Sequence, residues 1–172
     1  MSKENVKPLE ALVDVIIIRT KITEALKVIA RRKVKEQAEL DKKLANTNDE
    51  VEAGEIIEEI NGKVFECELI KRDFDIITKC CHEISGNLRK ANTIWPEYMG
   101  QFVERRVLLD KAADACWEVL DELQYIAEAV YGDKDKFTSI DLEIDALFHK
   151  IKKIQQADNR FLPDLKDSPK EA

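Results

Sequence analysis

Residues 53–91 read AGEIIEEINGKVFECELIKRDFDIITKCCHEISGNLRKA, and apolar side chains recur in this stretch every seven positions in two series, with Lys63 as the exception. The first series is Ala53, Ile60, Cys67, Phe74, Cys81 and Leu88, and the second is Ile56, Ile70, Ile77, Ile84 and Ala91. Such a sustained heptad pattern predicts one long helix packed lengthwise against other helices. Asn61-Gly62 usually indicates a turn. Both series keep their phase across it, so we expect the helix to continue, with a loss of about 1 kcal/mol at Gly62.

Similar patterns predict three further helices, at about residues 9–44, 97–131 and 139–157, in addition to the helix at about 50–92. Pro8 and Pro96 suit first helical turns, and Gly132 suits the position after a helix end. Because the links are short, consecutive helices are expected to run antiparallel. The sequence therefore predicts an all-α, antiparallel up-down-up-down four-helix bundle in residues 1–160, followed by a tail at 161–172.

Composition limits the classes of protein that the chain can be. It has 172 residues, a formal net charge of -7 and 37% charged residues, which fits long helices with polar outer faces. No apolar run is long enough to span a membrane, and residues 1–8 lack the order of a signal peptide, so we expect a cytoplasmic protein. Four cysteines in that compartment are expected to be reduced thiols rather than disulfides.

The first helix carries an apolar excess at its start. Its inward stripe is predicted to be Val15, Ile18, Ile22, Leu26, Ile29 and Val34, yet residues 13–18 are apolar nearly all round the helix axis. The fourth helix, at about 30 Å, is shorter than the others, at roughly 50 to 60 Å, and is expected to leave this end uncovered. Val13, Ile16 and Ile17 are therefore candidates for an interface with another copy or a protein partner. The alternative is that residues 161–165 cover them.

Two basic clusters suggest a second surface. One comprises Arg31, Arg32, Lys33 and Lys35, and the other comprises Lys150, Lys152 and Lys153. Counting helical rise from opposite ends of the bundle places both at the same height, where they would form one basic band. Such a band would bind backbone phosphates of nucleic acid without sequence readout, and its candidate contacts are Arg31, Arg32, Lys35, Lys152 and Lys153. The alternative is neutralisation by neighbouring glutamates.

Arg105 interrupts the heptad series of the third helix and falls at about the level of Arg19 and Glu83. A charged layer there would fix the register of the helices or of a partner. The alternative is that the arginines extend their charged ends to water.

No cluster in the sequence predicts catalysis. Cys80-Cys81-His82-Glu83 contains zinc-ligand residue types, but adjacent helical residues point about 100° apart and cannot chelate one ion together. The glutamates of residues 50–59 and the pair Glu118 and Asp121 could hold magnesium in an all-α nucleotide pyrophosphohydrolase, but the two groups stand about sixty residues apart and mostly off the heptad stripe, which favours solvated helix faces. The chain has no P-loop, dinucleotide fingerprint or triad. We therefore expect no enzyme, no metal and no cofactor.

One resemblance rests on the third and fourth helices. The residues that carry it are Arg105, Arg106, Ala112, Cys116, Leu120, the run 122–126 (ELQYI) and the run 152–159 (KKIQQADN). This pattern, over about 55 residues, resembles small four-helix-bundle proteins of diversity-generating retroelements, the accessory variability determinants, and related bundles from ribosomal RNA intervening sequences. The resemblance implies a ring-like homo-oligomer, often a pentamer, that binds nucleic acid and a reverse transcriptase. This chain differs from that pattern in its acidic net charge and longer first helices.

Taken together, the sequence predicts a non-enzymatic, homo-oligomeric interaction or accessory protein with a protein partner, and nucleic acid as a further candidate ligand. The alternatives are a magnesium-dependent nucleotide pyrophosphohydrolase and a purely structural bundle.

Overall fold

The computed structural model describes residues 8–133 and 135–167. Its α-helices are α1 (Pro8–Asn46), α2 (Glu50–Thr93), α3 (Met99–Ile126) and α4 (Thr138–Asp158). A π-helical turn, Ala127–Tyr131, extends α3, and a 3-10 helix, Asn159–Asp164, follows α4. The four α-helices pack against one another, which confirms the predicted all-helical class. No helix of the described residues is long and apolar enough to cross a membrane.

Local signals set the helix ends. The side chain of Asp49 caps α2 by accepting a hydrogen bond from the backbone N–H of Val51 at 2.9 Å. Gly132 ends the helical segment after α3 with a φ of 61°, in the left-handed region that glycine adopts without strain. Helix α2 runs unbroken through Asn61 and Gly62, as the constant heptad phase predicts.

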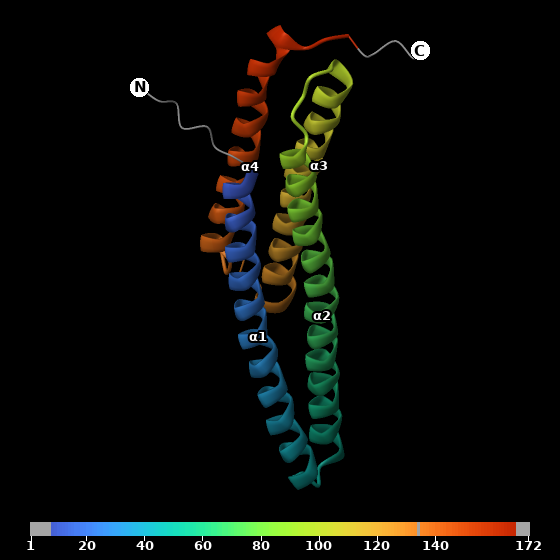
Figure 1. The fold of residues 1–172 in the computed structure, drawn as a ribbon. Helices are drawn as coiled ribbons and strands as arrows, with labels where there is room; N and C mark the ends of the chain where they lie inside the picture. The colour runs from blue at the N-terminus through green and yellow to red at the C-terminus, as the bar shows by residue number, and fades with distance from the viewer. Residues whose placement is uncertain (1–7, 134, 168–172) are drawn as a thin grey trace.

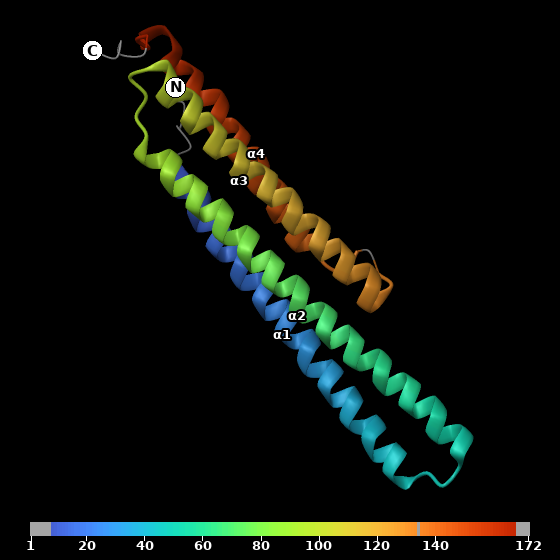
Figure 2. The same cartoon turned by 90° about the vertical axis from the view of Figure 1, so that its right-hand side faces the viewer.

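The helices form two hairpins of unequal length. Figures 1 and 2 show α1 and α2 side by side along their whole length, with the shorter α3 and α4 lying against only the half where α1 begins and α2 ends. The chain turns from α3 into α4 about midway along α1, where Arg32 and Ile29 lie beside Phe137 and Ile140. Residues 33–66 continue beyond that point as a hairpin of two helices, named here the two-helix extension.

The expectation that α4 leaves the start of α1 uncovered is wrong. Lys150, near the end of α4, forms an ion pair with Asp14 near the start of α1. The chain after the 3-10 helix also reaches the start of α3, where the Lys166 N–H donates to the Glu97 carbonyl at 3.0 Å. The reason is that α3, with 28 residues, is short as well as α4, with 21, so the end that neither helix reaches is the α1–α2 link.

The core follows the heptad series where four helices are present. Fully buried side chains from all four helices meet there, including Ile22, Ile77, Leu123 and Ile144. In the first series of α2, Cys81 and Leu88 are buried, whereas the preceding members from Ala53 to Phe74 are only half-buried. Ala53 and Ile60 lie on the two-helix extension, where α3 and α4 do not cover them, whereas Cys67 and Phe74 line an open groove between α1 and α2.

An ionic network occupies the α1–α2 contact where the bundle changes from four helices to two. The Nζ of Lys33 lies 2.6 Å from a carboxylate oxygen of Glu66, and the Nζ of Lys63 lies 3.0 Å from one of Glu36. The hydrogen bond from Lys63 lowers the pKa of Glu36 below its ordinary value. Lys33 is buried and Val34 is exposed, so the predicted inward place of Val34 is wrong; the helix turns Lys33 inward instead. The network also explains why Lys63 interrupts the apolar series.

All four cysteines are free thiols, and three of them are buried. Burial raises the pKa of Cys80 and of Cys116 to about 12 and that of Cys81 to about 11. Cys67 is half-buried, and burial also raises the pKa of its thiol.

These values predict selective labelling of the native protein. At pH 8 a thiol with a pKa of about 12 is only about one part in ten thousand thiolate, and the thiolate is the reactive form. Iodoacetamide at pH 8 is therefore expected to modify Cys67 first and the other three slowly. Mass spectrometry of the native protein should show one adduct, and the urea-unfolded control should show four. Equal labelling of Cys67 and Cys116 in the native state would contradict the prediction.

Candidate interaction surface

Helix α1 has apolar side chains on two opposite faces near its start. The inward face includes Ala11, Val15, Ile18 and Ile22, all buried. The outward face carries four apolar side chains that are each about half exposed, named here the outer stripe: Leu9 (54%), Val13 (55%), Ile16 (49%) and Ile17 (44%). Leu9, Val13 and Ile16 are spaced four and three residues apart, which is the spacing of a coiled-coil contact face. The structure thus leaves the three predicted interface residues accessible, on a face that none of the other helices covers.

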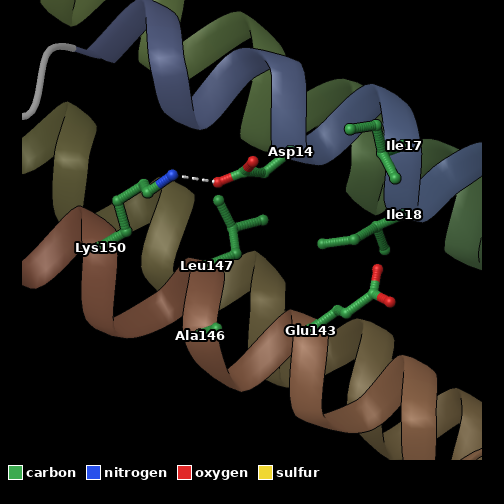
Figure 3. Close-up of a pocket in the computed structure, with 7 residues that line it drawn as sticks. All are labelled: Asp14, Ile17, Ile18, Glu143, Ala146, Leu147 and Lys150. Carbon is green, nitrogen blue, oxygen red and sulfur yellow. Dashed lines mark hydrogen bonds and ion pairs between the residues drawn. The ribbon is translucent and has the colours of Figure 1, made fainter.

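A shallow groove of about 240 Å³ between α1 and α4 adjoins the outer stripe. Figure 3 shows Ile18 of α1 and Leu147 of α4 in the space between the two helices, with the ion pair of Asp14 and Lys150 close by. A second ion pair, between Lys21 and Glu143, also joins α1 to α4. Because Ile17 belongs to both features, the stripe and the groove form one continuous apolar surface framed by charged pairs.

The structure does not bring the two predicted basic clusters together. Lys150 lies beside Asp14, whereas Arg32 lies 18 residues farther along α1, a separation of about 27 Å by helical rise. The predicted single band is therefore wrong, because α4 starts midway along α1 rather than opposite the α1–α2 link. Within the clusters, Arg32 binds Glu36 at 2.9 Å and Lys152 binds Asp110 at 2.8 Å. Arg31, Lys35 and Lys153 are exposed.

The two acidic groups lie apart from one another, and the second contacts the thiol cluster through Glu118. The glutamates of residues 50–59 are exposed on the two-helix extension, and Glu118 is exposed on α3, where it accepts a hydrogen bond from the thiol of Cys80 at 3.2 Å. Cys80 and Cys81 are buried while His82 is exposed. Among the residues that the structure describes, no three potential ligands are grouped around a metal position.

Arg105 is buried rather than extended to water. Its guanidinium binds Asp158 of α4 through two hydrogen bonds, from Nε to Oδ2 at 2.7 Å and from Nη2 to Oδ1 at 3.1 Å. Nη1 donates to the carbonyls of Ala91 and Ile94 at the end of α2. The predicted layer with Arg19 and Glu83 does not form. The charge of Arg19 lies close enough to Cys81 to affect the pKa of that thiol, and Cys81 is ten residues before Ala91, the α2 residue that Arg105 contacts.

Two charged residues at heptad positions indicate this ion pair in the sequence. Arg105 interrupts an apolar heptad series of α3, and Asp158 follows Ile144 and Ile151 at the same spacing of seven on α4. Two opposite charges at core positions of neighbouring helices predict a buried pair, since either charge alone would be costly to bury.

Comparison of the chain with family models, with curated proteins and with solved structures gives no match. The resemblance to retroelement accessory bundles therefore rests on the motif residues of α3 and α4 alone and remains a prediction.

Proposed function

We propose that this chain is a non-enzymatic cytoplasmic bundle that self-associates through the outer stripe of α1 and acts as an interaction or accessory protein. The observation that carries the proposal is the outer stripe itself, whose apolar side chains are about half exposed beside an apolar groove. Contiguous exposed apolar surface is uncommon on monomers and typically marks an interaction site.

We further propose that the bundle has the antiparallel up-down-up-down topology. Figures 1 and 2 support it, because the colour gradient from the N-terminus to the C-terminus runs in opposite directions along successive helices. A second copy is the partner that best suits the surface. It would present the same stripe, so that a two-fold arrangement places apolar side chains at the centre and the Asp14–Lys150 pairs toward the rim.

The rival functions gain less support from the placement of side chains. Arg31 and Lys35 are accessible for phosphate contact, but Lys152 lies in the separate cluster and is bound to Asp110. A gel shift at low salt that is lost in the Arg31→Glu, Arg32→Glu variant would support a nucleic-acid role. Magnesium-dependent release of pyrophosphate from nucleotides, abolished by Glu118→Gln, would support the hydrolase alternative.

Light scattering on a sizing column tests self-association. The wild type is expected to be a multimer, and Ile16→Glu is expected to be monomeric with unchanged helicity by circular dichroism. Placing a carboxylate in a desolvated interface costs several kcal/mol, which weakens association by at least about a hundredfold.

The matched control is Val28→Glu, because Val28 is 63% exposed on the same helix but lies outside the outer stripe. Its mass should equal that of the wild type. A monomeric wild type at the highest soluble concentration, or equal dissociation by both substitutions, would refute the proposed interface.

A further inference from the structure

Asp73 on α2 is a fully buried carboxylate with an incomplete set of partners. Its side chain is 0% exposed, and Oδ1 accepts from the guanidinium of Arg72, with Nη2 at 2.6 Å and Nε at 2.8 Å. Its other oxygen, Oδ2, is buried and has no hydrogen-bond donor among the described residues. Burying a carboxylate oxygen without a hydrogen-bond donor costs free energy, so we expect a further positive or hydrogen-bond-donating group beside Oδ2.

Glu122 lies on the turn of α3 that packs against this part of α2, since the guanidinium of Arg72 lies 5.6 Å from the ring centroid of Tyr125, three residues after Glu122. The Oε2 of Glu122 is also buried and has no hydrogen-bond donor among the described residues, and Asp73 raises the pKa of Glu122 both by its charge and by a side-chain hydrogen bond. Ionised carboxylates only accept hydrogen bonds, so two of them in contact can satisfy each other only when one carries a proton. Two ionised carboxylates in contact would also repel each other strongly.

We propose that Asp73 and Glu122 share one bound proton across the α2–α3 contact, with Arg72 balancing the remaining negative charge, so that packing of α3 on α2 is proton-linked. The protonated carboxyl of Glu122 donates to Oδ2 of Asp73, while Oδ1 stays bound to Arg72. This pair is independent of the outer stripe on α1.

The electrostatic surroundings agree with this arrangement. Burial and then the charge of Asp73 raise the pKa of Glu122, Arg72 opposes the rise, and Asp121 on α3 adds to it. At this height α1 presents Lys27, which lines the α1–α2 groove beside Phe74 and is bound to Glu24 at 3.4 Å.

Asp141 on α4 is half-buried, and burial alone raises the pKa of its carboxyl group, without a contribution from Asp73 or Glu122.

The direction of the pH dependence follows from the raised pKa of Glu122. Its ordinary value is 4.5, and in the folded protein the proton is held more tightly. The stabilisation from the shared proton is complete below the ordinary value and is lost as the pH rises through the raised pKa. Packing of α3 on α2 should therefore weaken on the alkaline side of that pKa.

The substitution Glu122→Gln tests the proposal, because glutamine keeps the shape and supplies a permanent N–H donor to Asp73. At pH 8 its melting temperature is expected to exceed that of the wild type by about 2–4 °C, and at pH 4 the difference should disappear. Asp121→Asn is the matched control: it removes the same charge from the neighbouring exposed residue, which contributes least to the raised pKa of Glu122, and should give a clearly smaller pH-dependent difference.

A second measurement needs no variant. Titration of the side-chain carboxyl carbons by NMR should show Glu122 gaining its proton at a higher pH than the exposed glutamates of residues 50–59. The proposal is overturned if Glu122 titrates together with those glutamates, or if Glu122→Gln and Asp121→Asn have the same effect at both pH values.

Discussion

Replacing Arg105 with alanine is expected to lower the free energy of unfolding by about 3–5 kcal/mol, because it leaves Asp158 as a buried charge without its partner. The Asp158 side chain is only 4% exposed, and the Arg105 side chain is 7% exposed. The same change removes the donors to the carbonyls of Ala91 and Ile94. One side chain thus holds the end of α2, the start of α3 and the end of α4 together.

Denaturant unfolding followed by circular dichroism measures this loss. The neighbouring Arg106 is the matched control, since it donates one exposed hydrogen bond, to Asn159 at 2.9 Å, and Arg106→Ala should cost at most about 1 kcal/mol. The double variant Arg105→Met, Asp158→Leu should recover part of the loss, because no unpaired charge remains buried. Similar losses for Arg105→Ala and Arg106→Ala would show that the buried pair contributes little.

Replacing Gly54, Gly62 and Gly86 together with alanine is expected to stabilise the protein by about 3 kcal/mol. All three lie inside α2, where alanine is favoured over glycine by about 1 kcal/mol per position. A Cβ atom at each position meets no heavy atom within 4 Å, so no packing cost opposes the gain. The gains should add because the positions are well separated.

The measurement is the midpoint of thermal unfolding, together with amide hydrogen exchange in α2. The midpoint should rise by about 6–12 °C, and exchange should slow around Gly54 and Gly62 in the two-helix extension. Gly132→Ala is the opposing control: its φ of 61° disfavours alanine, so this variant should lose about 1 kcal/mol. A triple variant no more stable than the wild type would mean that helix propensity does not limit the stability of α2.

The heptad pattern predicted the helices and their inward faces well, because burial of an apolar face requires that periodicity. It did not predict how far each helix slides along its neighbours, since a heptad series is the same after a shift of seven residues. The height of α4 against α1 was therefore wrong, and the joined basic band was wrong with it. Val34 was misplaced for a related reason: at the end of the four-helix core an ion pair, not an aliphatic contact, decides which side chain turns inward.

For the candidate interaction surface, the sequence identified accessible apolar residues by a partly wrong argument, and their role in an interface stays a prediction. Val13, Ile16 and Ile17 are exposed, but α4 does cover the inward side of the same segment. What the apolar excess revealed was a second face of α1. The buried pair of Arg105 with Asp158 and the two unpartnered carboxylate oxygens of Asp73 and Glu122 were not predicted, because each set combines residues about fifty positions apart whose alignment depends on how the helices are shifted along one another.

The two-helix extension makes the molecule longer than its four-helix core. Its helices project about 20–25 Å beyond the four-helix part, and the ionic network of Lys33, Glu36, Lys63 and Glu66 lets that part of the α1–α2 contact exist without a further helix over it. The outer stripe lies at the opposite end of α1. In an assembly joined through the outer stripe, every copy would hold its α1–α2 link well away from the shared contact. The two-helix extensions would then project separately from the assembly and remain accessible to a second kind of molecule.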